Sequence, residues 1–241
     1  MLFAAFLYKF QPFLDHSNPD LSATTFFEIP YLEGVFCEKR VTDVHPNLSR
    51  GTVSGTASFQ IENTTGTEQE VAFAVNPGYK VNSVQANGQP VPFQIDDYQE
   101  SNMALLNVTI PALESIDLCF DYHGFPQDWN LMETMQGKPE ISSKYLCLEN
   151  QALAPAIMNA GIADGTFSSI TNITLPDTMT VIPFGLAEAK KEAEHDNGTI
   201  TWRIEDTENR GILYAGDYVR QDIEAVGTTI QFYYGRKHQP I

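Results

Sequence analysis

Residues 53–61 read VSGTASFQI, and from Val53 onward every second position carries a small or apolar side chain. Serine, threonine or glutamine occupies the positions between them. This alternation is the pattern of a β-strand with one buried face and one solvated face. A polar turn follows at Asn63 to Gly66, and the run from Val71 to Val75 alternates again. We therefore predict that these two runs form a hairpin.

The same pattern continues along the chain. Asn87-Gly88 separates strand-like runs at 79–85 and 91–95, and both residue types tolerate the positive φ angles of a type I′ hairpin turn. A second turn is predicted at Asp196-Asn197-Gly198. Further strand-like runs lie at 106–110, 116–122, 144–148, 168–175, 178–184, 199–204, 213–219 and 228–234.

Helical signals are weak throughout. Residues 186–195 form the one stretch rich in Ala, Glu and Lys, where we expect at most one short helix. Residues 128–141 have the composition of a long loop. Many short strands without helical crossovers predict an all-β fold, an antiparallel β-sandwich. Trp202 alternates with two isoleucines, which places it in the predicted core.

Two segments are predicted along the chain. Residues 1–30 form an apolar, proline-bearing lead, whose first apolar run is shorter than the roughly 20 residues of a membrane span. It also lacks the basic start of a signal peptide. This lead is either a buried element or the end of a membrane span that starts before residue 1. Residues 31–241 carry the strands and form the predicted β-sandwich domain.

The net charge of the chain limits the classes of molecule that it can bind. The 241 residues carry a formal net charge of −17, which repels phosphate backbones and excludes nucleic acid as a partner. Acidic surfaces of this kind mostly serve solubility.

Cys37, Cys119 and Cys147 show no Cys-x-x-Cys spacing, so we expect neither a disulfide framework nor a cysteine zinc site. Cys119 and Cys147 lie in strand-like runs, where such cysteines are usually small buried apolar residues.

No catalytic motif is present. The five histidines are scattered without His-Glu-x-x-His, and no nucleophile elbow, phosphate-binding loop or dinucleotide fingerprint occurs. We therefore predict no catalytic residue, no metal ligand and no cofactor, so this chain is not expected to be an enzyme by itself. Trp129, in the predicted loop, is either a platform for a sugar or protein partner or a residue packed against the loop base.

Several short segments occur in an order that matches a known family. The segments are VNPGYKVNSV at 75–84, NGQPVPF at 87–93, NVTIP at 107–111, FDYHG at 120–124, ITLP at 173–176 and GTITW at 198–202. From about Tyr31 to Lys237 the chain resembles the N-terminal β-domain of aminopeptidase N-type (gluzincin) zinc metallopeptidases. In that family a saddle-shaped sandwich precedes a thermolysin-like zinc domain. The looser pattern here is similar to divergent bacterial versions joined to transporter-permease membrane segments.

The resemblance also implies a binding residue. In the family, the segment equivalent to 145–155 carries a Gln-x-Glu element, whose glutamate contacts the free amine of the substrate. By position Glu149 matches that glutamate, and Cys147 stands in place of the glutamine. The arginine and aspartate that normally follow are replaced within residues 152–159. The resemblance thus implies a peptide as the ligand of the longer protein.

Two main hypotheses about function follow. The first is a non-catalytic accessory β-domain of a larger aminopeptidase-like polypeptide, extracytoplasmic and tethered to a membrane. Its partner would be a zinc peptidase-like domain outside this chain. The alternative is a surface module that binds carbohydrate or protein, because a sandwich fold does not fix function. A stand-alone hydrolase with an unfamiliar site is the third and weakest hypothesis.

Overall fold

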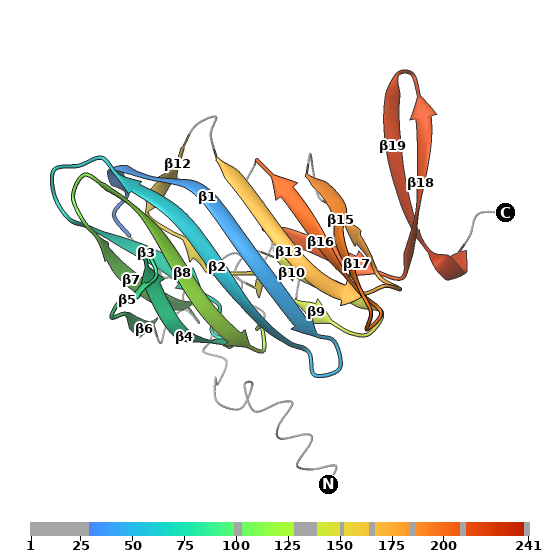
Figure 1. Cartoon of the computed structure of the whole chain (residues 1–241), viewed down its shortest axis with the longest axis horizontal. Helices are drawn as coiled ribbons and strands as arrows, with labels where there is room; N and C mark the ends of the chain where they lie inside the picture. The colour runs from blue at the N-terminus through green and yellow to red at the C-terminus, as the bar shows by residue number, and fades with distance from the viewer. Residues whose placement is uncertain are drawn as a thin grey trace, which may run out of the picture.

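The computed structural model describes residues 29–98, 103–127, 139–149, 152–163, 167–183, 187–207 and 211–238. Nearly all of them lie in β-strands, arranged as several sheets (Figure 1). The predicted all-β fold is confirmed. The lead segment up to residue 28, the centre of the predicted loop at 128–138 and Trp129 within it lie outside the described residues. In the described part of the chain, no helix is long and apolar enough to cross a membrane.

A nine-stranded sheet forms one layer, in the order β15-β16-β13-β1-β2-β8-β4-β5, with β12 also paired to β1. Its strands are β1 (Leu32–Asn47), β2 (Thr52–Asn63), β4 (Tyr79–Ala86), β5 (Gln89–Pro90), β8 (Glu114–Gly124), β12 (Ala160–Ile162), β13 (Ser168–Pro176), β15 (Glu188–His195) and β16 (Thr199–Asp206). The pairs β1–β12 and β1–β13 are parallel, and the other pairs are antiparallel. The parallel pairs arise because the chain passes through the other layer before it returns to β1.

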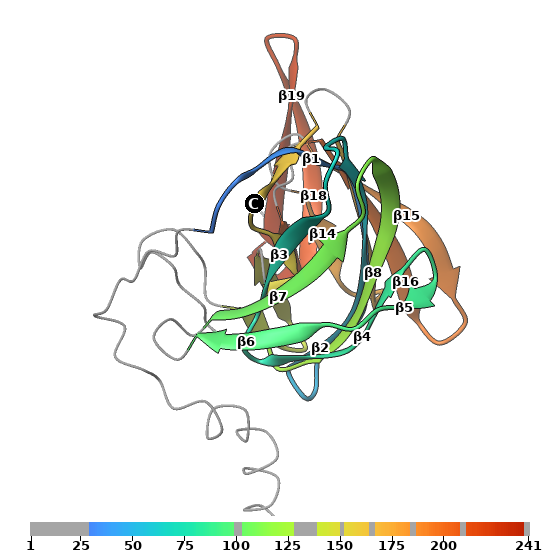
Figure 2. The same ribbon diagram turned by 90° about the vertical axis from the view of Figure 1, so that its left-hand side faces the viewer.

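Two four-stranded sheets form the second layer and lie behind the large sheet in the view of Figure 1. The first has the order β11-β3-β7-β6 and the second the order β14-β17-β10-β9. Their strands are β3 (Gln69–Val75), β6 (Gln94–Tyr98), β7 (Met103–Ile110), β9 (Glu140–Ile141), β10 (Tyr145–Glu149), β11 (Ala156–Ile157), β14 (Thr180–Ile182) and β17 (Ile212–Gly216). Figure 2 shows β3 and β7 facing β2 and β8 across the interior.

One hydrophobic core joins the layers. Phe59 of β2 and Phe120 of β8 point inward from the large sheet and meet Phe73 of β3. The ring centroids of Phe73 and Phe120 are 4.7 Å apart, and those of Phe59 and Phe73 are 5.2 Å apart. The tilted ring planes are those of favourable aromatic pairs. The alternation from Val53 to Ile61 thus buries the predicted face of β2 in a sandwich.

The predicted hairpin between the runs at 53–61 and 71–75 is wrong. β2 pairs with β1 and β8, whereas β3 pairs with β7 and β11 in the other layer. The turn between them is a corner that carries the chain from one layer to the other. Buried Asn63 fixes this corner, because its Nδ2 donates to the backbone oxygens of Thr67 and Pro111 at 2.9 and 2.8 Å. Alternation defines the buried face of a strand but not its partner.

The stretch at 186–195, where we expected at most one short helix, forms an edge strand, β15, over residues 188–195. Antiparallel pairing with β16 satisfies the backbone of β15, so tertiary context overrides helix propensity. Its charged side chains are exposed, as is common for an edge strand that resists pairing with other chains. The turn at Gly198, which joins β15 to β16, is confirmed, with φ of 74°.

The turn at Asn87-Gly88 is also confirmed, with φ of 49° and 75°. Its return strand is shorter than predicted and consists of β5 alone. The following strand, β6, pairs with β7 in the other layer. All three cysteines are free, with Cys37 and Cys147 buried and Cys119 half-buried.

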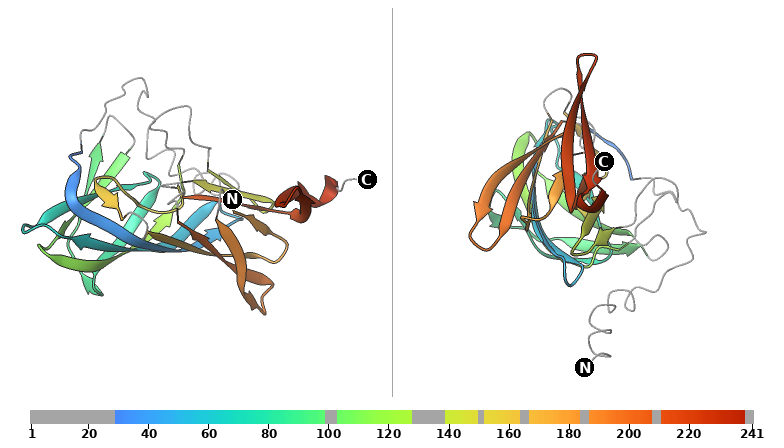
Figure 3. Two further views of the ribbon diagram at one scale, coloured as in Figure 1. Left: turned by 90° about the horizontal axis from the view of Figure 1, so that it is seen from above. Right: turned by 90° about the vertical axis from the view of Figure 1, so that its right-hand side faces the viewer.

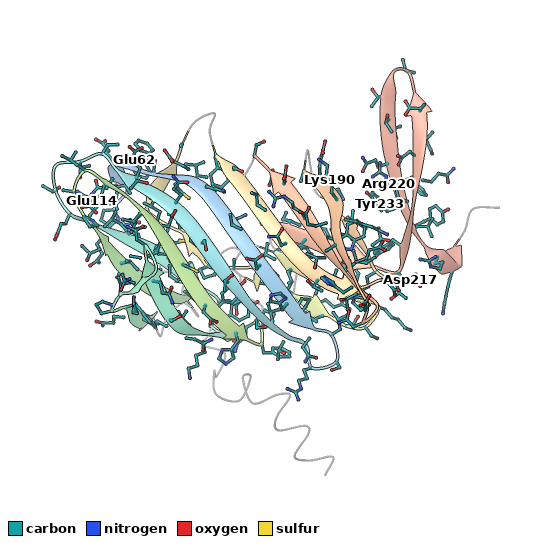
Figure 4. All side chains as sticks on the ribbon, viewed as in Figure 1. Glu62, Glu114, Lys190, Asp217, Arg220 and Tyr233 are labelled. Atoms are coloured by element: carbon teal, nitrogen blue, oxygen red, sulfur yellow. The ribbon has the colours of Figure 1, made fainter. Side chains whose placement is uncertain are left out.

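A two-stranded hairpin, β18 (Tyr218–Ala225) and β19 (Thr228–Gly235), projects from the sandwich (Figures 1 and 3). In the part of the chain that the structure describes, these strands pair only with each other. A short 3₁₀ turn, η2 (Arg236–His238), follows. Arg220 and Tyr233 lie on the hairpin (Figure 4) and pair directly across it.

Truncation of Trp202 tests the predicted and observed core position of this side chain, which is 9% exposed on β16. Trp202→Ala should lower the free energy of unfolding by about 3–5 kcal/mol, because it removes buried apolar surface and leaves a cavity. Urea denaturation monitored by circular dichroism measures the change. Leu113→Ala is the control, since Leu113 is large and apolar but exposed. A loss for Trp202→Ala no larger than that of the control would contradict the strand register.

Candidate functional site

Glu149 is the last residue of β10, where it lies opposite Ile212 of β17. Leu146 and Leu148 of the same strand point into the core, so Glu149 lies on the other face of the sheet. Tyr145 and Cys147 share that face with it. The register places Tyr214 of β17 directly opposite Cys147. We call the four residues Tyr145, Cys147, Glu149 and Tyr214 the Glu149 cluster.

Hydrogen bonds within the cluster orient the carboxylate. The hydroxyl of Tyr214 donates to Oε1 of Glu149. The thiol of Cys147 lies 3.8 Å from the same oxygen, within reach of a weak S–H···O contact. The carboxylate is therefore held by a tyrosine from the neighbouring strand and by a thiol two residues before it.

The electrostatics keep the neighbours of Glu149 protonated. The hydrogen bond to Glu149, together with burial, raises the pKa of Tyr214 well above its ordinary range. Burial, and then the negative charge of Glu149, raises the pKa of Cys147 to about 11. At neutral pH Cys147 is a thiol and not the thiolate that nucleophilic chemistry requires. The cluster is built to present a carboxylate, which can accept hydrogen bonds from a cationic group.

The chain enters the interior of the sandwich soon after Glu149. Ala152, Leu153 and Ala154 are buried between the layers and connect the sheet of β10 to the sheet of β11. We call residues 152–154 the interior crossing. Carbonyl groups at such a position need donors, because buried and unpaired backbone groups are costly. Two tyrosines from the large sheet supply those donors.

Tyr79 of β4 donates its hydroxyl to the carbonyl of Ala152, and Tyr122 of β8 donates to the carbonyl of Leu153 at 2.6 Å. Their ring centroids are 5.1 Å apart. Burial raises the pKa of both phenols well above the ordinary value, so both remain donors over the physiological pH range. The tyrosine pair therefore fixes the segment that follows Glu149 against the large sheet.

The structure brings together only part of what the sequence suggested. Glu149 and Cys147 lie in one cluster, whereas the placement of Trp129 falls outside the described residues. Sequence reasoning did not identify Tyr214, Tyr79 or Tyr122 as partners, although all three lie in predicted strand runs. Their contacts depend on register between strands far apart in the sequence. Among the described residues, no group of three or more His, Cys, Asp or Glu side chains is placed to hold a metal ion.

Comparison with known proteins gives a likeness of fold. No family model and no curated protein matches the sequence. The structure is similar to the M1 zinc metallopeptidase of Deinococcus radiodurans, with a TM-score of 0.60 and 14% identity. A mutant of that peptidase bound to a Tyr-Ser-Ala substrate gives a TM-score of 0.60 and 15% identity. A two-domain M1 zinc metallopeptidase mutant bound to L-arginine gives 0.60 and 14%.

Each match covers 90% of this chain and 51% of the other chain. The chain thus spans about half the length of these peptidases. At this level of identity the likeness shows the fold alone, and it agrees with the resemblance suggested by the order of sequence segments.

Removal of one tyrosine hydroxyl tests the interior crossing. Tyr122→Phe should lower the free energy of unfolding by about 1–3 kcal/mol, because it leaves the buried carbonyl of Leu153 without a donor. Chemical denaturation measures this change. Tyr31→Phe is a matched control at an exposed tyrosine. Equal stability of the two variants would show that the hydroxyl of Tyr122 does not support the crossing.

Proposed function

We propose that this chain is a non-catalytic accessory β-domain of a larger, M1-like peptidase polypeptide, and that it packs against a zinc domain outside this chain. The fold likeness supports this proposal, because the similar M1 peptidases extend well beyond the matched region. The sequence resemblance supports it independently. We also propose an extracytoplasmic, membrane-tethered position, supported by the apolar start and by the similarity to versions joined to transporter-permease segments.

The projecting hairpin is the observation that carries the proposal, because its two faces differ. Side chains that pair across β18 and β19 lie on the same face. On one face, which we call the hairpin face, apolar side chains predominate. It carries Val219, Ile223, Ile230, Phe232 and Tyr234, together with Gln221, Ala225 and Thr228. The opposite face is polar and includes Arg220 and Asp222, whose side chains form an ion pair at 2.6 Å.

The hairpin face is exposed in this chain. Ile223, Ile230 and Phe232 are 44%, 50% and 49% exposed. An isolated two-stranded hairpin is marginally stable in water, and a contiguous exposed apolar patch usually marks an interaction surface. A ribbon with one mainly apolar face and one mainly polar face is suited to lie on another protein surface. We assign this surface to the adjoining zinc domain of the same polypeptide.

Glu149 gives the proposed domain a part in ligand binding. By its place in the Gln-x-Glu-like segment it corresponds to the glutamate that contacts the free amine of a peptide. Its carboxylate is oriented by Tyr214, and a charge-assisted hydrogen bond to an ammonium group is stronger than a neutral one. One of the similar M1 structures holds a Tyr-Ser-Ala substrate. We propose that Glu149 binds the amino terminus of a peptide at the edge of the cleft.

Amide hydrogen exchange tests the proposed packing. The complete reading frame that contains this sequence should be expressed beside the chain of 241 residues. The amides of β18 and β19 should exchange quickly in the chain alone and at least about tenfold more slowly in the longer protein, because burial suppresses local opening. The amides of β1 and β2 serve as the internal control, since they are in the centre of the large sheet in both proteins.

Unchanged exchange of the hairpin, or a reading frame without a further domain, would contradict the proposed packing. The same two proteins also test whether the catalytic activity and the zinc ion reside outside the chain of 241 residues. An aminoacyl-arylamide assay should give turnover only with the longer protein, and stoichiometric zinc should be found only there. Chelator-sensitive turnover by the chain alone would show that it is itself an enzyme.

Substitution of Glu149 tests the proposed binding role. In the longer protein, Glu149→Gln should weaken binding of a peptide with a free amino terminus by about tenfold or more, the effect of losing one charge-assisted hydrogen bond. Isothermal titration calorimetry measures the affinity. The same peptide with an acetylated amino terminus is the control and should bind both proteins equally weakly. Equal affinity of the free peptide for both proteins would leave Glu149 as a structural partner of Tyr214.

A further inference from the structure

The free end of the projecting hairpin is a two-residue turn, Val226-Gly227, between β18 and β19 (Figure 1). The φ angles of the two residues are 51° and 78°. Positive φ at both central residues is the property of a type I′ turn, which matches the twist of paired strands. The side chain of Val226 is fully exposed. The hairpin therefore ends in a single apolar group that points into solvent.

Valine is an unfavourable residue at this position. A side chain branched at Cβ is strained when φ is positive, so such turns normally use Asn, Asp or Gly. The same chain shows the ordinary solution at another two-residue turn, where Asn87 and Gly88 have φ of 49° and 75°. Asparagine at position 226 would therefore form the same turn with less strain.

Contacts within the described part of the chain do not explain this valine. A fully exposed side chain gains nothing from packing, so it does not offset the strain of the turn. Leu113 is the other apolar residue with positive φ in that part of the chain, and its backbone N–H donates to the carbonyl of Thr65 at 3.1 Å. Strained residues gather at functional sites, which makes Val226 a candidate contact residue.

Exposure of apolar side chains increases along the hairpin toward this turn. Val219 and Tyr234, at its base, are half-buried. Ile223 and Ile230, which pair nearer the turn on the hairpin face, are exposed. Val226 lies beyond this pair and is fully exposed. The end of the hairpin that the sandwich supports least is therefore the end that offers the most apolar surface.

We propose that Val226 is an apolar anchor that inserts into an apolar pocket on the adjoining zinc domain, an inference that rests on the function proposed above. The pocket would accept one branched aliphatic side chain, because burial of a valine removes apolar surface from water. A few residues buried in such pockets contribute most of the binding energy of an interface. Docking of the hairpin thus offsets the strain in its turn.

Two observations favour a partner in the same polypeptide. About half of each similar M1 peptidase lies outside the matched region, so those proteins carry further surface beside this fold. A lipid surface is disfavoured, because Glu224 lies near the turn and the formal net charge of −17 repels anionic head groups. A second copy of this chain is the competing partner, and its binding would depend on protein concentration.

Val226→Asn tests the anchor through two effects of opposite sign. In the chain of 241 residues, an Asn-Gly turn is less strained, so the amides of β18 and β19 should exchange about two- to fivefold more slowly. In the longer protein, loss of the apolar anchor should make the same amides exchange about tenfold faster. Amide hydrogen exchange measured by NMR gives both changes. An effect on the turn alone would have the same sign in both proteins.

Two further variants separate the apolar contact from the turn. Val226→Thr keeps the branched shape and the strain but adds a hydroxyl, so it should speed exchange in the longer protein only. Leu113→Asn is the matched control, since Leu113 is an exposed apolar residue with positive φ in the turn between β7 and β8. It should leave the exchange of β18 and β19 unchanged in both proteins.

Three outcomes would overturn the inference in different ways. Hairpin amides that are protected in the longer protein but insensitive to Val226→Asn would remove the anchor and leave the proposed packing in place. Equally fast exchange of the hairpin in both original proteins would contradict the packing itself. Concentration-dependent protection in the chain of 241 residues, lost in Val226→Asn, would assign the anchor to a second copy.

Discussion

The hydrogen bonds from Tyr79 and Tyr122 to the carbonyls of the interior crossing are the constraint on which much of the structure depends. The crossing joins the sheet of β10 to the sheet of β11, so both parts of the second layer are attached through it. These residues form a turn and no strand, so the crossing has no sheet ladder of its own, and its buried carbonyl groups are satisfied by side chains. The tyrosine pair meets this need and holds the layers in register.

The position of Glu149 follows from the same constraint. Its strand is fixed on one side by β17, through Tyr214, and at its end by the anchored crossing. A site for a charged ligand needs side chains with fixed orientation, and here a carboxylate is presented by a sheet and not by a mobile loop. The hairpin face and the Glu149 cluster belong to different sheets, so the proposed packing and the proposed ligand binding can be tested separately.

The sequence predicted which residues are inside more reliably than which strands are partners. Alternation identified the inward face of β2 and the burial of Trp202, because these properties depend on local period and apolarity. Alternation failed for the pairing of β2 and β3, since pairing depends on the corner at Asn63. The composition of β15 did not indicate a strand, because an edge position accepts helix-forming residues. Glu149 was suggested by resemblance alone. Tyr214 required the cross-strand register, which no local pattern contains.

A β-bulge in β1, between Cys37 and Lys39, has a consequence for how the strand tolerates changes in length. Without it, unbroken alternation from Val35 and Cys37 would turn Lys39, Val41 and Asp43 toward the core. The bulge absorbs one residue, so loss of Glu38 would leave the same side chains inward on a regular strand. Deletion of one residue from a regular part of β1 would instead turn the inward side chains on one side of the deletion outward, and the outward ones inward. At the bulge, β1 therefore contains a site where loss of a single residue keeps the inward faces of the strand unchanged on both sides.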